Sequence, residues 1–176
     1  EITFVPSLHG RIFFGRVPLP GSWSHTPPLP LPAWRYRMGG AFGILIRASA
    51  NGDPASARTV YHNGSADLVD VELAGRHADV LLLGLAGRRA TPDYLSRVTG
   101  ALGPRVVIPT HHDAFFGPLE AGERLLPGID MRGFYADVRS CAPDARIVTP
   151  LYRDDVVIPL EGDPRDVSVI DARGLG

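Results

Sequence analysis

The sequence predicts an α/β fold, and three observations lead to this expectation. Between Thr59 and Val148, short β-branched runs alternate with segments whose apolar residues recur at helical spacing. Hydrophobic residues make up 44% of the chain and charged residues 21%, as in globular domains. The 176 residues suffice for one domain with a sizeable core. We therefore expect one unit over residues 1–160, with a loop at 13–36 inserted, and a polar tail over 161–176.

Each expected strand is a short run of β-branched, aromatic or aliphatic residues bounded by turn formers. The turn Asn51-Gly52-Asp53-Pro54 should join two of these runs as a hairpin. Pro109 is expected to break the strand before it, because proline cannot donate a backbone hydrogen bond. The expected strands are Ile2–Pro6, Ala41–Ala48, Ala57–His62, Asp79–Leu83, Arg105–Ile108, Arg146–Val148 and Val156–Pro159.

Helices are expected where apolar residues recur every three or four positions. Such spacing appears in Leu68–Arg76 and in Met131–Cys141. A third helix should begin with Thr91 as its N-cap and Pro92 at its first position, and should stop at Gly103-Pro104.

The inserted loop is rich in proline and aromatic residues. Six prolines between Pro18 and Pro32 exclude a helix or a central strand there. We expect a packed lid over the functional site, or equally a structural flap or an oligomer contact. The aromatic residues in or beside the loop are Phe13, Phe14, Trp23, Trp34 and Tyr36.

Composition narrows the classes of function. The net charge is -1 and the basic residues are scattered, so no nucleic-acid footprint is visible. No apolar run reaches the roughly 20 residues that a membrane span needs. Cys141 is the only cysteine, which excludes an intrachain disulfide and a cysteine-rich zinc site. A metal would therefore need His, Asp or Glu ligands. The cellular compartment stays open.

Histidines and carboxylates gather at the ends of the expected strands. Such residues can converge when their strands are neighbours, and imidazole is a common zinc ligand. Each of them alone is more often an ordinary loop residue, and Asp67 could equally cap the next helix. The candidates are His9, His62, His111, His112, Asp67 and Asp113. Arg11, Arg88 and Arg89 could hold an anionic group, although an exposed arginine is usually just solvated.

Four segments, in order along residues 1 to 120, resemble the second half of metallo-β-lactamase-fold hydrolases. The branch they resemble contains ascorbate-6-phosphate lactonases and N-acyl-phosphatidylethanolamine phospholipases. The segments are Ile2-Thr3-Phe4-Val5-Pro6-Ser7-x-His9, Thr59-Val60-Tyr61-His62-Asn63-Gly64, Asp79-Val80-Leu81-Leu82-Leu83 and Val107-Ile108-Pro109-Thr110-His111.

This resemblance implies the C-terminal portion of an αββα sandwich. The family's His-x-His-x-Asp-His signature would then lie before Glu1, and a missing N-terminal half of the fold would be a partner. His9 and His111 would be metal ligands by resemblance. Ser65 stands where the family has an aspartate that bridges two metals. Asp67 or His62 would compensate as ligands, or one metal would bind instead of two.

The implied metal is zinc, with manganese or iron as alternatives. His112 and Asp113 would support catalysis beside the metal or face the substrate. The expected function is a metal-dependent hydrolase that activates water against an ester, lactone or phosphodiester. Its substrate would be a small, partly apolar or anionic molecule. The main alternative is a degenerate, non-catalytic binding or assembly module of the same fold, which Ser65 favours. An unrelated α/β binding protein with incidental histidines is a third possibility.

Overall fold

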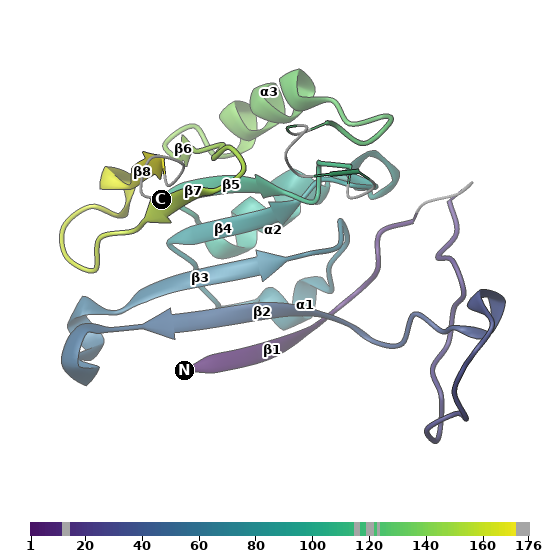
Figure 1. Ribbon diagram of the computed structural model, residues 1–176. Helices are drawn as coiled ribbons and strands as arrows, with labels where there is room; N and C mark the ends of the chain where they lie inside the picture. Colours follow the sequence, from purple (N-terminus) through teal and green to yellow (C-terminus); the bar gives the residue numbers. More distant parts are fainter. Residues whose placement is uncertain (12–14, 115–116, 119–121, 123, 172–176) are drawn as a thin grey trace.

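Six strands form one mixed sheet in the order β1-β2-β3-β4-β5-β6 (Figure 1). This computed structural model describes residues 1–11, 15–114, 117–118, 122 and 124–171. Its strands confirm the coarse α/β class. The sheet contains β1 (Ile2–Ser7), β2 (Ala41–Ala48), β3 (Arg58–Asn63), β4 (Val80–Gly84), β5 (Val106–Thr110) and β6 (Arg146–Ile147). A separate antiparallel pair consists of β7 (Asp154–Val157) and β8 (Ser168–Asp171).

The direction of the strands decides where their ends lie. β1 pairs antiparallel with β2, and β2 pairs antiparallel with β3, so β1 and β3 run the same way. β3, β4, β5 and β6 are then parallel neighbours. Consequently β1, β3, β4 and β5 all finish at one edge of the sheet.

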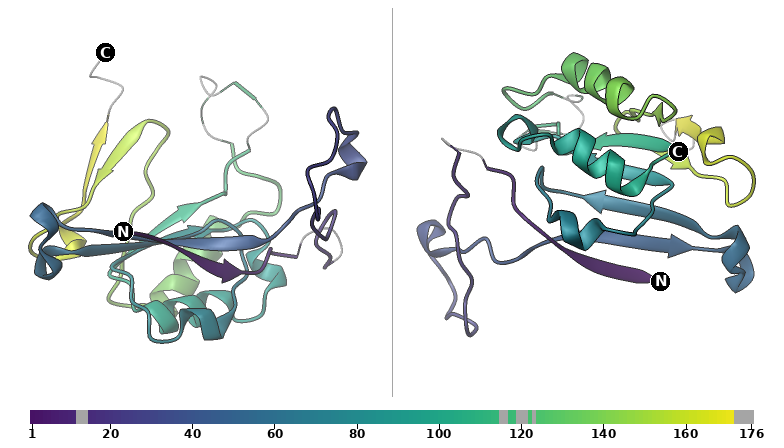
Figure 2. Two further views of the ribbon diagram at one scale, coloured as in Figure 1. Left: turned by 90° about the horizontal axis from the view of Figure 1, so that it is seen from below. Right: turned by 180° about the vertical axis from the view of Figure 1, so that it is seen from behind.

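In the described part of the chain, three α-helices connect the parallel strands: α1 (Asp70–Leu73), α2 (Tyr94–Leu102) and α3 (Met131–Cys141). All three lie on one face of the sheet, as the edge-on view in Figure 2 shows. The core on this side contains Tyr61, Leu81, Leu83, Val98 and Phe134, each at most 1% exposed. The apolar stripe of α2 therefore packs on the parallel strands as its helical spacing indicates. No helix among the described residues is long and apolar enough to cross a membrane.

The first two helices are shorter than the sequence indicates. α1 covers four residues of the expected Leu68–Arg76. α2 begins at Tyr94, and the expected N-cap role of Thr91 is wrong, because its hydroxyl donates 2.6 Å to the Ala66 carbonyl instead. A tertiary hydrogen bond has replaced the local cap.

Pro109 lies inside β5, so the expectation that it breaks the strand is also wrong. The Val107 carbonyl accepts from Val148, and the Thr110 carbonyl accepts from Leu85. Along a strand, the backbone N–H and C=O groups of successive residues point alternately to the two neighbouring strands. Since Val107 points toward β6 and Thr110 toward β4, the backbone nitrogen of Pro109 faces β6. Since β6 ends at Ile147, beside Val107, the missing N–H of Pro109 breaks no ladder hydrogen bond.

Among the described residues, β7 and β8 cover one end of the opposite face of the sheet. There Val167 is buried with Val80, Val106 and Ile108. The described part of the predicted tail is therefore packed against the main unit; residues 172–176 lie outside the described chain. The remainder of this surface, here called the open face, carries the apolar side chains Ile2, Phe4, Phe42, Ile44 and Ile46.

Candidate functional site

A cavity of about 670 Å³ opens at the edge where β1, β3, β4 and β5 end. The carboxyl ends of parallel strands are a common place for ligand sites in α/β proteins. His9 follows β1, Ser65 follows β3, Leu85 follows β4 and His111 follows β5. The lining is completed by Arg11, Met38, Ala86, Gly87, Arg88, Arg89, Ala90, Leu126, Pro127, Gly128, Ile129 and Asp130.

His9 is oriented by its own backbone neighbour. Its Nδ1 lies 2.7 Å from the Gly10 carbonyl oxygen. Only a protonated Nδ1 can donate to that carbonyl, so the neutral ring carries its lone pair on Nε2. Many metal-binding histidines are oriented in the same way: one ring nitrogen binds the metal, and the other donates its N–H to a backbone carbonyl. His9 therefore has the tautomer that a ligand or a general base requires.

Gly10 ties the loop after β1 to the loop after β3. Its amide donates 2.7 Å to the Ser65 hydroxyl, and a Cβ on Gly10 would lie 3.2 Å from the Ala66 nitrogen. The absence of a side chain lets the two loops approach closely. This contact holds Ser65 at the cavity wall beside His9.

His111 reaches the cavity through an unusual backbone conformation. Its φ is 51°, in the left-handed region that residues other than glycine adopt rarely. The chain turns sharply there as it leaves β5, and His111 takes an exposed position on the cavity wall. Strained residues of this kind concentrate at functional sites.

Three guanidinium groups give the cavity a positive wall. Arg88 is only 11% exposed at its side chain and donates 2.6 Å to Asp137 and 3.2 Å to the Asp130 carbonyl. Arg89 donates 2.5 Å to the Asp130 carboxylate. The Gly133 amide, with help from Arg89 and Arg88, lowers the pKa of the Asp130 carboxyl. Asp130 therefore stays ionised and offsets part of the arginine charge. Arg11 also lines the cavity and adds further positive charge.

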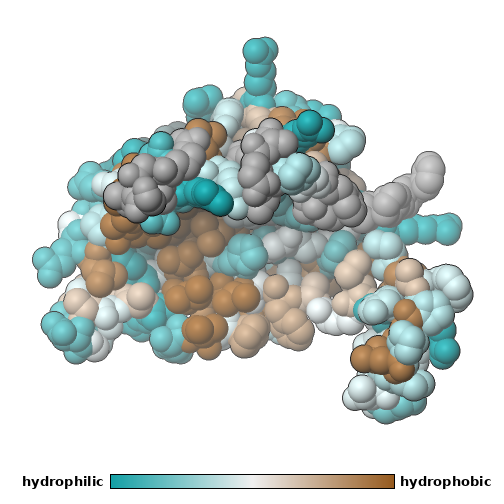
Figure 3. Space-filling model, in the orientation of Figure 1, coloured by the Kyte–Doolittle hydropathy of each residue, from teal (hydrophilic) through white to brown (hydrophobic). Residues whose placement is uncertain are grey.

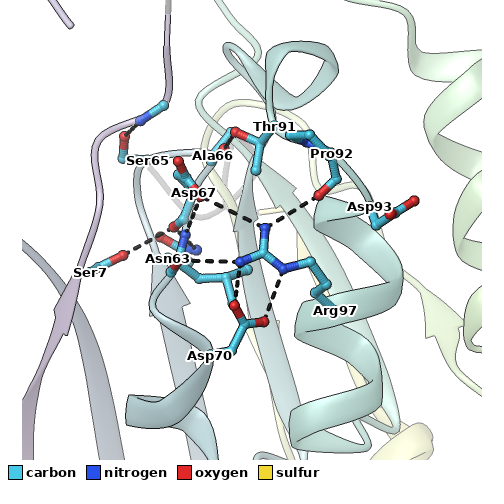
Figure 4. Close-up of polar contacts among 12 residues, drawn as sticks. Ser7, Asn63, Ser65, Ala66, Asp67, Asp70, Thr91, Pro92, Asp93 and Arg97 are labelled. Carbon is cyan, nitrogen blue, oxygen red and sulfur yellow. Dashed lines mark hydrogen bonds and ion pairs between the residues drawn. The ribbon is translucent and has the colours of Figure 1, made fainter.

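The polar groups of the turn after β3 bond to neighbouring parts of the fold, as Figure 4 shows. The Asp67 carbonyl accepts from the Ser7 hydroxyl at 3.0 Å and from the Asn63 amide at 3.0 Å. The Asp67 carboxylate accepts 2.8 Å from the Leu68 amide and lies 4.0 Å from Arg97. Asp67 does not line the cavity. Its carboxylate faces the start of α1 and Arg97 of α2.

Three other candidate residues also lie outside the cavity lining. His62 stands on the opposite side of β3 from buried Tyr61, where its strand neighbours are Ile44 and Leu82. Burial lowers the pKa of His62. His112 is 9% exposed, and its Nδ1 is buried without a hydrogen-bond partner in the described chain. Asp113 forms a backbone bridge to Leu125.

Two candidate imidazoles thus line one cavity, but among the described residues they belong to no larger cluster of ligands. Within the ranges that the structure describes, no three His, Cys, Asp or Glu side chains are grouped so that they could hold a metal ion. His9 and His111 offer part of a donor set. Comparison with known proteins adds no relative, since no protein family, curated protein or solved structure matches the chain.

The sequence indicated His9, His111, Arg11, Arg88 and Arg89 as candidates, but it did not indicate the rest of the cavity lining. The segment Leu126–Asp130 and the side chain of Met38 complete the lining. Asp130 carried a recognisable signal, because it caps α3 by accepting 2.9 Å from the Gly133 amide. Nothing local in Leu126 or Met38 indicates that distant segments meet there.

Proposed function

We propose that the cavity is the substrate site of a metal-dependent hydrolase that acts on an ester, lactone or phosphodiester. The observation that carries the proposal is that His9 and His111 line the same cavity as Arg11, Arg88 and Arg89. Imidazoles suit a catalytic metal, and guanidinium groups suit the charge that develops on oxygen during hydrolysis.

The donor set fits a zinc site in part. The His9 tautomer leaves Nε2 available, and His111 lines the same cavity. A catalytic zinc site needs about three protein ligands, and the grouped side chains of the described residues supply fewer. We propose that the remaining ligands come from a second layer of the fold. A bound zinc would supply an activated water at neutral pH.

The open face of the sheet supports the idea of a second layer. Phe4 is 66% exposed and Phe42 is 56% exposed on this face, and their rings meet edge to face at 6.4 Å. Figure 3 shows the hydrophobic surface that results. An uncovered apolar sheet face normally packs against another sheet or helix layer. A facing sheet would complete the αββα sandwich that the sequence resemblance implies.

The lining also suggests what kind of substrate enters. Met38, Leu85, Leu126 and Ile129 give the cavity an apolar part, while the arginine wall suits an anionic group. A partly apolar molecule with one negative charge would place its reacting carbonyl or phosphoryl group near the imidazoles.

Hydrolysis assays on the full-length protein test this proposal. We expect turnover of chromogenic carboxylic esters or phosphodiesters in the presence of zinc, manganese or iron, and its loss on chelation. His111→Ala should lower kcat by at least about tenfold if it removes a metal ligand. His25→Ala is the matched control, since His25 is exposed and contacts Ser24. Activity that persists after chelation or after His111→Ala would contradict the proposal.

A non-catalytic binding module is the second candidate, and one observation favours it. The Ser65 hydroxyl is held by the Gly10 amide, and the nearest carboxylate, Asp67, is engaged by Leu68 and Arg97. No bridging carboxylate therefore enters the cavity from this turn. A protein that binds anionic ligands through Arg88 and Arg89 but hydrolyses none would support this second reading.

A further inference from the structure

Residues 15–40, here called the arm, project from the body of the molecule. Figures 1 and 2 show the arm extending away from the sheet in every view. Its neck is closed by two backbone hydrogen bonds of 2.9 Å, from Met38 to Leu19 and from Gly39 to Gly21. Of the arm, only Met38 lines the cavity, so the arm does not cover the cavity as a lid would. Phe13 and Phe14, which the sequence places in the same loop, lie outside the described residues.

The arm is positively charged in a protein whose net charge is -1. It contains Arg16, Arg35 and Arg37 and no aspartate or glutamate. The chain has no carboxylate side chain anywhere between Ile2 and Gly52. The positive charge of the arm is therefore not neutralised by any neighbour in sequence.

The same arm exposes large apolar side chains. Leu29 is 75% exposed, Trp34 is 74% exposed and Tyr36 is 53% exposed. The guanidinium groups of Arg35 and Arg37 lie 5.8 and 6.0 Å from the centre of the Trp23 ring. Arginine thus lies next to aromatic surface, as it does where side chains meet a boundary between water and an apolar phase.

We propose that the arm docks on an anionic lipid surface. Its arginines would lie at the headgroups, while Trp34, Tyr36 and Leu29 would enter the boundary between headgroups and acyl chains. Charge complementarity selects an anionic partner, and the exposed Leu29, an aliphatic side chain that offers no ring for a base to stack on, favours lipid over nucleic acid. The proposal uses no metal and no catalytic step, so it stands or falls separately from the proposed hydrolase.

The two tryptophans of the chain, Trp23 and Trp34, both lie in the arm, so the tryptophan fluorescence of this chain reports on the arm alone. We expect vesicles made of equal parts phosphatidylcholine and phosphatidylserine to shift the emission to shorter wavelength. Pure phosphatidylcholine vesicles should give a much smaller shift, and high salt should weaken the effect. Cosedimentation with the same vesicles measures the affinity.

Two pairs of variants separate docking from general charge effects. Arg16→Gln with Arg35→Gln should weaken vesicle binding about 30-fold, from about 1 kcal/mol per arginine at an anionic surface. The matched control, Arg132→Gln with Arg139→Gln, removes the same charge from exposed positions of α3 and should change binding little. Trp34→Ser should weaken binding without changing the fold, since Trp34 is largely exposed.

Three outcomes would overturn the proposal. The first is an emission that anionic vesicles do not shift. The second is equal weakening by the arm variants and by the α3 control. The third is equally tight binding to heparin or single-stranded DNA, unaffected by Trp34→Ser, which would point to a polyanion partner instead.

Discussion

His111 follows the end of β5, and its backbone conformation brings it to the cavity. Its left-handed φ of 51° places it at the cavity and carries a backbone cost that glycine would not have. The sequence identified His111 as a candidate because it follows an apolar run. Nothing in that run indicates the left-handed turn, which the surrounding fold imposes.

The first prediction concerns this backbone cost. His111→Gly should be more stable than His111→Ala by about 1 kcal/mol, because alanine keeps the Cβ that disfavours a left-handed conformation. At His77, whose φ is not positive, the order should reverse. Urea unfolding of the four variants measures both differences, and an alanine variant of His111 that is as stable as the glycine variant would disprove the strain.

His62 makes a second prediction, on pH. Burial on the sheet lowers its pKa from the ordinary value of 6.5. The folded state then binds this proton less readily than the unfolded state, so stability is fully present above pH 6.5 and falls as the pH drops below it. His62→Gln should reduce that loss, and His25→Gln in the exposed arm should not. The test is to measure free energies of unfolding above and below pH 6.5 for the unaltered protein, His62→Gln and His25→Gln. Equal pH dependence in the three proteins would contradict the burial of His62.

At the scale of elements, the strands follow from their sequence more closely than the helices do. Apolar runs bounded by turn residues place β1 to β5 to within about two residues of their bounds. α1 and α2 depart further because tertiary contacts compete with local signals, as the hydrogen bond from Thr91 to Ala66 demonstrates. Arg97 adds to this by donating to Asp70 at 2.5 and 2.9 Å, which fixes α2 against the start of α1.

The close approach of β4 to the turn after β3 gives a third prediction. A Cβ on Gly84 would lie 2.8 Å from the carbonyl oxygens of Asn63 and Gly64, both of them backbone atoms. Gly84→Ala should therefore destabilise the fold by about 1 to 3 kcal/mol. Gly100→Ala is the matched control: Gly100 lies within α2 with open space around it, and alanine there should stabilise by about 0.5 to 1 kcal/mol. Thermal or urea unfolding compares the two variants. A Gly84→Ala variant with an unchanged free energy of unfolding would contradict the close approach of Gly84 to the Asn63 and Gly64 carbonyl oxygens.

At the scale of the whole molecule, the sequence predicts that candidate residues lie at strand ends. It does not predict which strands are neighbours or which distant segments meet at that edge. The candidate histidines lie where parallel strands end, and the pairing of β1 with β2 and of β2 with β3 brings His9 to the same edge as His111. The pairing order and the return of Leu126–Asp130 to this edge depend on contacts between distant segments. The open face is likewise a property of the assembled sheet, since the alternation in β1 alone does not say which side stays uncovered.

The central claim is that His9 and His111 act on one ligand, and zinc titration of the full-length protein by calorimetry tests it most directly. We predict one zinc ion bound per chain, with weaker binding after His9→Ala and after His111→Ala, and little further loss when the two changes are combined. His25→Ala should bind as the unaltered chain does. A full-length protein that binds no zinc, or whose zinc affinity neither His9→Ala nor His111→Ala changes, would contradict the account.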